Sequence, residues 1–458
     1  MKMRIVYPVV LLIVLHVMSW QTFAQLTFSG QVRVRGEYRD GQGSPSVKDT
    51  VPAAFISQRT RIIAGYSAYR VKVWATVQDV RVWGQDASSV NRVTADANDG
   101  LMLHEAWAEI SLVDTGKVVR DFYLRLGRQE LIYDDSRLLG NLDWLQQARR
   151  HDAALLKFEH RGWTANLGAA YNQNAERKSG TVYNGVPTGY AAGTNGIGAL
   201  YKAMQFVYVA RKLKTGKVST LFFKDDFSKF HFAAADIDKK NPIYEGGAWS
   251  RYTAGVFAQF KPVAPIQLTL NTVYQGGHYR EGTRLDEYLL SAYAQYTPAT
   301  RVGVGAGIDV TSGNAGADPA RKFQRFDPLY GTPHKFWGTM DYFYAADGFG
   351  ANGLTDFYIK TRYTPLTALT VNVDAHRFVL PHAVNNTAGD MLQRELGTEL
   401  DITCQYTLTP AIAVEGGYSA LFATPTLASA AVKNIPRADT FAQWAYVMIA
   451  IKPEPVKK

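Results

Sequence analysis

Residues 26–39 read LTFSGQVRVRGEYR, and this stretch decides the fold class. Its apolar and polar residues alternate strictly, which is the period of a β-strand and not of a helix. One row is apolar or small and the other is polar, with three arginines in it: Leu26, Phe28, Gly30, Val32, Val34, Gly36 and Tyr38 against Thr27, Ser29, Gln31, Arg33, Arg35, Glu37 and Arg39. A soluble β-sandwich also alternates, but it does not need so charged a polar row.

The same period of two recurs along the chain and predicts eighteen strands. They start near Leu26, Phe55, Tyr69, Leu101, Val119, Arg150, Gly162, Tyr201, Gly216, Trp249, Ile266, Leu285, Thr300, Leu354, Leu369, Arg394, Ala411 and Thr440. Without the two near Arg150 and Gly216, sixteen would remain. Short turns such as Arg161-Gly162 alternate with long connections such as 172–200, and both termini fall on the short side. This pattern predicts an all-β fold, an antiparallel transmembrane β-barrel of the outer-membrane type.

Composition excludes several other classes. The chain has 458 residues, of which 12 % are aromatic and 20 % charged, and a single cysteine, Cys404. After the N-terminus no apolar run reaches the ~20 residues of a spanning helix. One thiol can form neither an internal disulfide nor a Cys-based zinc site. Aromatic residues near the strand ends suit the interfacial girdles of a barrel: Tyr38, Tyr66, Tyr69, Tyr296, Tyr363, Tyr406, Trp444 and Tyr446.

The N-terminus predicts export. Lys2 and Arg4 precede an uncharged run from Ile5 to Trp20, and Ala24 is a suitable cleavage position. We therefore expect residues 1–24 to be a signal peptide and residues 25–458 to be a single barrel without a plug domain. Export removes nucleic acid from the partners that a net charge of +10 would otherwise suggest.

Strand parity predicts a basic lumen. The inward rows include Arg33, Arg35, Arg39, Arg59, Arg61, Arg70, Lys72, Arg125, Lys360 and Arg362, with acidic residues between them. One interpretation is a solvated, salt-bridged wall, which any wide pore needs. The other is a track for a carboxylate-bearing polymer, because the guanidinium fork binds carboxylates through two hydrogen bonds. Interleaved acidic residues would keep each contact weak, so that a solute enters and leaves.

The sequence gives no local support for catalysis. His104 and Glu105 are adjacent in a strand, as are His151 and Asp152, so that each pair would point to opposite faces. We expect no catalytic residue, no metal site and no cofactor.

Residues 126–152 read LGRQELIYDDSRLLGNLDWLQQARRHD, and this run resembles the alginate-export porin family. Further matches are GIDVTSG at 307–313, FDPLYGTPH at 326–334, GTMD at 338–341, LGTELD at 396–401 and GYS at 417–419. The resemblance implies an eighteen-stranded outer-membrane barrel with an arginine-rich, loop-gated lumen. It also implies that Arg128, Arg137, Arg149 and Asp152 belong to the constriction. His151 stands where family members often have an aromatic residue.

From these observations we expect a monomeric outer-membrane channel with periplasmic termini, surrounded by lipid. It would pass an anionic polysaccharide or its oligomers by passive diffusion, with periplasmic secretion components as further partners. The alternative is a general or anion-preferring porin for small acidic solutes. A third reading is a surface carbohydrate-binding adhesin or a barrel hydrolase that uses the aromatic residues of the 314–353 loop. Those aromatic residues could instead pack inside the barrel as a lid.

Overall fold

The computed structural model describes residues 24–85, 101–113, 121–173, 176, 178, 183, 201–236, 242–279, 282–313, 325–345 and 352–457. Nearly all regular structure is strand. The strands are β1 (Gln25–Asp40), β2 (Ala53–Ala68), β3 (Val71–Val82), β4 (Met102–Ser111), β5 (Phe122–Gln129), β6 (His151–His160), β7 (Trp163–Tyr171), β8 (Ala203–Leu213), β9 (Gly216–Phe232), β10 (Pro242–Val263), β11 (Ile266–His278), β12 (Arg284–Ala299), β13 (Val302–Thr311), β14 (Thr355–Leu366), β15 (Leu369–Val379), β16 (Glu395–Thr409), β17 (Ile412–Ala423), β18 (Phe441–Ile451) and β19 (Val456–Lys457). Two single helical turns accompany them, η2 (Pro333–Lys335) and α2 (Pro425–Ala428).

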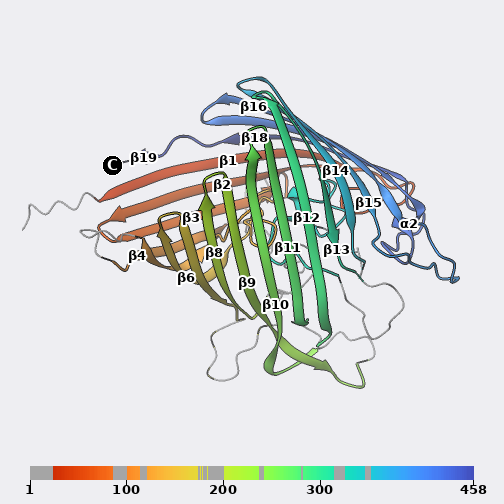
Figure 1. Ribbon diagram of the computed structural model, residues 1–458, viewed down its shortest axis with the longest axis horizontal. Coiled ribbons are helices and arrows are strands. Elements are labelled where there is room, and N and C mark those ends of the chain that lie inside the picture. The colour runs from red at the N-terminus through yellow and green to blue at the C-terminus, as the bar shows by residue number, and fades with distance from the viewer. Residues whose placement is uncertain are drawn as a thin grey trace, which may run out of the picture.

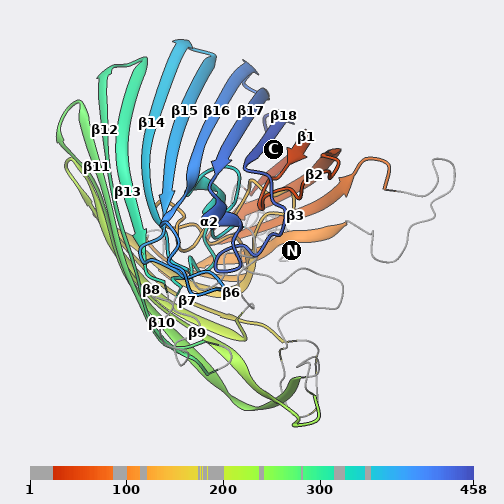
Figure 2. The same ribbon diagram turned by 90° about the vertical axis from the view of Figure 1, so that its right-hand side faces the viewer.

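The strands form one closed antiparallel barrel (Figures 1 and 2). Each of the first seventeen pairs with the next along the chain, and β18 returns to β1 with Val32 opposite Ile451. The two-residue β19 adds a short pairing beside the start of β1. The eighteen predicted strands are confirmed in order, including β6 near Arg150 and β9 near Gly216. Closure matters because an open sheet edge would leave backbone groups without hydrogen bonds in hydrocarbon.

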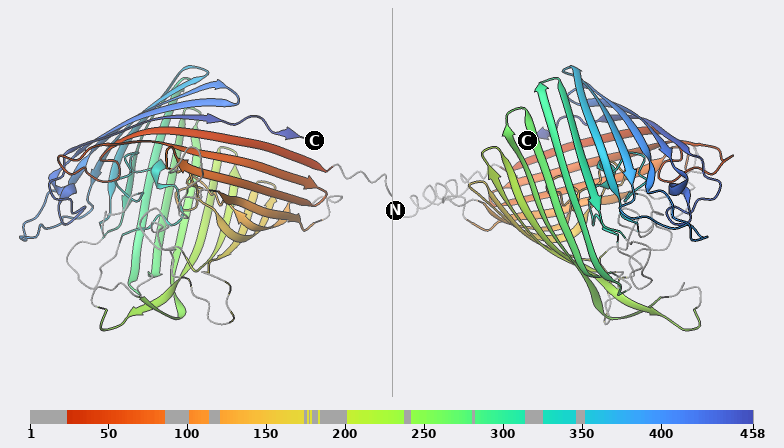
Figure 3. Two further views of the ribbon diagram at one scale, coloured as in Figure 1. Left: turned by 180° about the vertical axis from the view of Figure 1, so that it is seen from behind. Right: turned by 45° about the vertical axis from the view of Figure 1, so that its right-hand side comes forward.

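The two ends of the barrel differ. Most connections at one end contain two residues, as at 161–162, 214–215 and 410–411, whereas those at the other end are mostly long, as at 130–150, 312–354 and 424–440. Figures 1 and 3 show the long connections and α2 gathered at one end. β1 begins and β18 ends at the short-connection end, as the sequence predicts.

The wall is apolar outside and polar inside, as the alternation predicts. In β1, Leu26 and Phe28 are more than half exposed on the outer face, while Arg33, Arg35 and Glu37 are buried inside. Within the described part of the chain, no helix has the length and apolar character needed to cross a membrane.

The predicted aromatic girdles are correct only in part. Tyr66, Tyr296 and Tyr363 are exposed on the outer face near the short-connection end, which fits a girdle. Trp444 and Tyr446, however, are only 1 % and 6 % exposed and share the inward row of β18. They are part of the packing inside the lumen.

Arg70 also departs from its predicted place. It lies in the turn between β2 and β3 with a positive φ of 64°, and its Nε donates a hydrogen bond to the Ser111 carbonyl. It therefore ties the β2–β3 turn to the end of β4 and is not part of an inward row. Residues 1–23, with most of the predicted signal peptide, lie outside the described residues.

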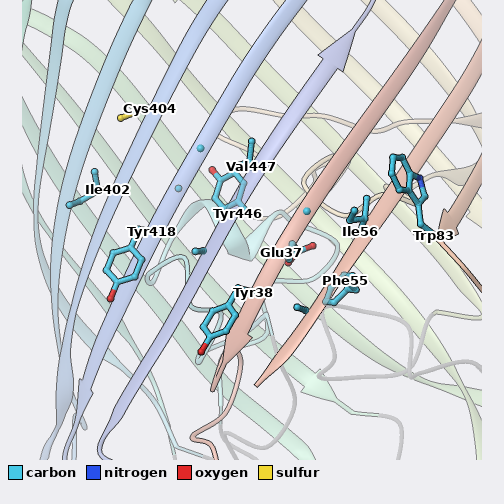
Figure 4. A pocket seen from close by; sticks show the side chains of 15 residues that line it. Glu37, Tyr38, Phe55, Ile56, Trp83, Ile402, Cys404, Tyr418, Tyr446 and Val447 are labelled. Atoms are coloured by element: carbon cyan, nitrogen blue, oxygen red, sulfur yellow. The ribbon is translucent and has the colours of Figure 1, made fainter. Parts of the chain in front are cut away.

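On the outer face, a shallow hollow of about 1010 Å³ crosses the seam between β18 and β1 (Figure 4). The small residues Gly36, Ala54 and Gly416 are among those that line it. Figure 4 shows Tyr38 and Tyr418 beside it. Cys404 borders the hollow and is exposed on this outer face, in the same row as the exposed Leu400 and Tyr406.

Candidate functional site: the barrel lumen

Two connections fold back into the barrel and narrow its lumen. One is the 142–148 segment between β5 and β6, which we call the strap. The other is the 326–345 segment between β13 and β14, which we call the insert. Both contain buried side chains, such as Gln146 in the strap and Tyr330 and Trp337 in the insert. Loops therefore fill part of the lumen.

The strap docks on β1 and β2 through the carboxylate of Asp143. Arg59 Nη1 donates a hydrogen bond to Asp143 Oδ1 at 2.7 Å, and Arg33 Nη1 donates one to Oδ2 at 3.2 Å. Arg61 Nη1 lies 3.5 Å from the same Oδ1. Burial raises the pKa of Asp143, but the hydrogen bond and charge of Arg59 outweigh it. With the charges of Arg33 and Arg61, they hold the pKa below its ordinary value.

The arginines also hold the strap's backbone and its neighbouring side chains. Arg33 Nη1 donates to the carbonyl of Asp143 at 2.7 Å, and Arg35 Nη1 donates to that of Trp144 at 2.8 Å. The Arg35 guanidinium lies 4.2 Å from the centre of a Trp144 ring. Gln146 accepts a hydrogen bond from Arg33 Nε at 3.0 Å. The strap covers these arginines, so that Arg33 and Arg35 are only 5 % and 3 % exposed.

The insert docks on the opposite wall through buried ion pairs. Arg251 of β10 binds the Asp225 carboxylate of β9 with Nε at 3.0 Å and Nη2 at 2.6 Å, while its Nη1 binds Asp327 of the insert at 2.6 Å. Gln275 of β11 exchanges two hydrogen bonds with the backbone of Asp327. Tyr330 of the insert donates its hydroxyl to Asp225 at 2.8 Å. These groups are buried on both sides of the contact.

A second contact of the insert depends on a glycine. The Met340 amide donates to Glu399 Oε1 at 2.8 Å, and the Thr339 hydroxyl donates to Asp401. Gly338 precedes them with a φ of +82°, and a Cβ atom there would lie 2.5 Å from both carboxylate oxygens of Glu399. Only glycine combines this backbone conformation with this close approach.

The aromatic residues of the insert pack inside the barrel. Six are 0–1 % exposed: Phe326, Tyr330, Trp337, Tyr342, Phe343 and Tyr344. Rings this deeply buried are not available to stack on sugars at the cell surface, so the structure agrees with the packed-lid reading of this loop. Phe323 lies outside the described residues.

The strap and the insert touch each other. Trp144 stacks on His334 with ring centres 4.4 Å apart, and its edge meets Tyr446 at 4.9 Å. The Leu142 amide donates to the Thr332 hydroxyl at 3.1 Å. The two segments therefore form one partition across the lumen.

A cavity of about 350 Å³, which we call the inner cavity, lies on the side of this partition toward the short connections. Its cations are Lys335 of the insert and Lys360 and Arg362 of β14. Asp374 and Glu415 supply acidic groups, and Lys360 Nζ lies 3.1 Å from Asp374. Trp144 of the strap and Tyr446 border the same space.

Lumen-facing glycines widen this region. Gly303, Gly305 and Gly307 alternate along β13, and a Cβ atom at Gly305 would lie 2.2 Å from the hydroxyl oxygen of Tyr293. Tyr358 covers Gly307 in the same way, and the two tyrosine rings stack with centres 5.8 Å apart. The glycines leave room for both rings against the wall, and Tyr293 borders the inner cavity.

A second cavity of about 340 Å³, the outer cavity, lies toward the long connections. Leu142, Leu145 and Gln147 of the strap line it on one side. Arg149 and Arg150 supply positive charge, and burial lowers the pKa of Arg149 to about 10 and also lowers that of Arg150. The strap thus borders both cavities.

Arg137 lies in a third cavity of about 250 Å³, beside the inner one. Its guanidinium bonds Asp309 at 2.5 Å and lies over the Phe336 ring at 3.8 Å. Arg149 donates to the Gly331 carbonyl at 2.5 Å. Both arginines therefore connect the 130–150 loop to the rest of the lumen. Among the described residues, no group of three or more His, Cys, Asp or Glu side chains could hold a metal ion.

The predicted site residues thus fall into groups by accessibility. Arg33, Arg35, Arg59 and Arg61 lie beneath the strap. Arg137 is buried in loop contacts, and Arg149 is half-buried where it bonds the insert beside the outer cavity. Arg125 pairs with Glu109 at 2.7 Å and lies 3.9 Å from the Trp107 ring centre, and it is partly exposed on the inner wall. Lys360 and Arg362 are the predicted residues that border the inner cavity.

Arg128 and Asp152 lie on a different row from the one expected of a constriction. Two hydrogen bonds of 2.8 Å join their side chains, which are 36 % and 51 % exposed. Arg128 is three residues after the inward Arg125, so strand alternation turns it to the outer face, opposite Ala106. The pair borders the outer cavity from the long-connection end.

The alternation along strands could not predict that residues of the strap and the insert line the lumen. Asp143, Trp144 and Lys335 lie in connections, where strand alternation gives no orientation. A usable signal was the apolar content of the 130–150 connection, because Leu131, Leu138 and Leu139 would be unusual in a fully solvated loop.

Comparison with known proteins agrees with this architecture. Residues 24–440 match the protein family described as alginate export. Among solved structures, OccAB1 of Acinetobacter baumannii is similar with a TM-score of 0.58 and 13 % identity, over 94 % of this chain and 96 % of that one. OpdQ of Pseudomonas aeruginosa has a TM-score of 0.56 and 13 % identity, over 94 % and 98 %. OpdO of the same organism has 0.57 and 14 %, over 93 % and 97 %. No curated protein sequence matches the chain.

Proposed function

The chain belongs to the alginate-export family, and on this premise we propose that it is an outer-membrane porin for anionic saccharides of the alginate type. Polymers or their oligomers would cross by passive diffusion, without catalysis and without a cofactor. The observation that carries the proposal is the inner cavity, where Lys335, Lys360 and Arg362 meet a lumen lined by flat aromatic rings.

The charges of the inner cavity suit a carboxylate-bearing sugar. Among the described residues, Arg362 forms no ion pair, and its side chain is exposed. Lys360 pairs with Asp374 at 3.1 Å, and both side chains remain partly exposed to the cavity. Acidic residues beside the cations weaken each contact, which lets a solute leave as readily as it enters.

The difference between the two ends of the barrel supports a proposed orientation in the membrane. We place the short connections and both termini in the periplasm and the long connections outside the cell. Residues 1–24 would be the signal peptide and residues 25–458 the mature barrel. The barrel would act as a monomer, surrounded by lipid, and receive its solute from periplasmic secretion components.

Single-channel recording in planar bilayers tests the proposed function. We expect anion selectivity and block by uronate oligomers, with no block by neutral oligosaccharides of equal length. The double variant Lys360→Gln/Arg362→Gln should lower the anion-to-cation permeability ratio and weaken uronate block at least tenfold. Arg81→Gln is the matched control, because Arg81 lies on the outer face in an exposed pair with Asp79. Cation selectivity that the double variant leaves unchanged would contradict the proposal.

A general or anion-preferring porin for small acidic solutes is the second candidate. The sizes of the cavities favour it, since cavities of about 350 and 340 Å³ on the two sides of the strap hold sugar-sized solutes. In the same recordings, equal block by monomeric and oligomeric uronates would support this alternative. Stronger block by longer oligomers would support the polysaccharide channel.

A further inference from the structure

The strap is held by guanidinium groups, which bind both the carboxylate of Asp143 and the backbone carbonyls of the strap. Three guanidinium groups, those of Arg33, Arg59 and Arg61, surround the one carboxylate of Asp143. Arg59 is 0 % exposed, and among the described residues its Nε has no hydrogen-bond acceptor. Glu130 and Glu105 also act on Arg61, so Arg33 and Arg59 are the two guanidinium groups that depend on Asp143. A carboxylate is the natural partner of the guanidinium fork.

The carboxylate in this cluster can be reached from the lumen. The Asp143 side chain is 42 % exposed, whereas those of Arg33 and Arg59 are 6 % and 1 % exposed. A solute therefore meets Asp143 first and the arginines only when Asp143 moves. Exchange of one carboxylate for another keeps the charge of the cluster unchanged.

The backbone supplies hinges at both ends of the strap. Leu142 has a φ of +47° and Ala148 a φ of +51°. This left-handed region is unfavourable for residues with a side chain, and the docked contacts maintain it there. Release of the strap would relieve both residues.

The strap also lies where a gate is needed. Trp144 lines the inner cavity, while Leu142, Leu145 and Gln147 line the outer one. Movement of the strap would join the two spaces, with Lys360 and Arg362 on one side and Arg149 and Arg150 on the other.

We propose that the strap is a carboxylate-operated gate between the inner and outer cavities. Asp143 occupies a carboxylate site on the arginines of β1 and β2, and a carboxylate of the solute takes over this site and releases the strap. A uronate oligomer is the class of ligand that fits, because it carries a carboxylate on every sugar and hydroxyls that replace the lost backbone acceptors. The inference rests on the proposed function.

The accessibility of Ser57 depends on the position of the strap. It is 6 % exposed, and its hydroxyl accepts a hydrogen bond from Gln146 Nε2 at 2.9 Å. In a Ser57→Cys/Cys404→Ser protein, a small neutral methanethiosulfonate should label the thiol slowly while the strap is docked. We expect a tetrameric uronate oligomer to accelerate labelling at least tenfold, and maltotetraose to leave it unchanged. Gln405→Cys/Cys404→Ser is the control, because Gln405 is already exposed on the inner wall.

Adding Asp143→Asn tests the gate without a ligand. This variant should label Ser57→Cys at the fast rate from the start and lose the response to uronate, whereas Asp143→Glu should keep slow labelling. A heat-modifiability gel verifies that each variant has folded into a barrel. Slow labelling of the folded Asp143→Asn protein, or unchanged labelling where uronate blocks the channel, would overturn the gate and leave the proposed function intact. If uronate neither blocks nor accelerates labelling, both are overturned.

Discussion

The strap and the insert close the same lumen by different physical means. The strap has one half-exposed carboxylate that faces several arginines. Its backbone carbonyls accept further hydrogen bonds from the same arginines. The insert buries six aromatic rings at 0–1 % exposure and joins Arg251 in a buried ion-pair network. Polar contacts can be exchanged for contacts with a charged solute, whereas burial of rings has no such substitute. The comparison indicates that the insert is a fixed wall and the strap is the movable part.

The largest effect should come from the ion pair that fixes the insert. Arg251→Ala leaves Asp225 and Asp327 facing each other in a buried site without their shared cation. We expect it to lower the free energy of unfolding by about 3–5 kcal/mol, the usual loss when one partner of a buried ion pair is removed. Urea unfolding in detergent, followed by heat-modifiability, measures this.

Arg362→Ala is the control for that measurement. Its side chain is exposed in the inner cavity, and the stability should stay within about 0.5 kcal/mol of the parent. If Arg251→Ala were as stable as Arg362→Ala, the insert would not be fixed by this network and the contrast with the strap would fail.

A smaller effect should follow at Gly338, where the insert approaches Glu399. Gly338→Ala introduces a Cβ atom 2.5 Å from the carboxylate oxygens at a φ of +82°. We expect a loss of about 2–3 kcal/mol, from backbone strain and the displaced carboxylate together. The unfolding free energy of the purified barrel reports it.

Gly389 separates the cost of backbone strain from the cost of displacing the Glu399 carboxylate. It has a similar φ of +93°, but nothing lies within 4 Å of a Cβ atom there. Gly389→Ala should therefore lose only the strain component, about 1 kcal/mol. Equal losses at both positions would mean that the contact with Glu399 contributes nothing to holding the insert.

The sequence predicted the barrel well because alternation is a local property. Each strand shows its own inward and outward rows, and the short and long connections give the two ends. The lumen was harder to predict, because parity tells which face a side chain takes and not what covers that face. Arg33 meets Asp143 across 110 residues of chain, and no period of two indicates such a contact. The girdle prediction for Trp444 and Tyr446 is wrong for the same reason, because their position in a strand gives no sign that Trp144 of the strap packs against them.

The smallest expected effect is the pH dependence of the labelling rate. It tests whether the charge of Asp143 holds the strap. The arginines hold the pKa of Asp143 below its ordinary value of about 3.9. A depressed pKa means that the docking contribution is complete above the ordinary value and is lost only as pH falls through the pKa of the docked carboxylate. We therefore expect labelling of Ser57→Cys/Cys404→Ser, after correction for the pH dependence of thiol reactivity with Gln405→Cys/Cys404→Ser, to stay constant from pH 8 to pH 5 and to rise below about pH 4. With Asp143→Asn added, the corrected rate should be fast and flat throughout. A rise between pH 7 and pH 5 would place the pH-sensitive group elsewhere, and the difference between the strap and the insert would then not rest on Asp143.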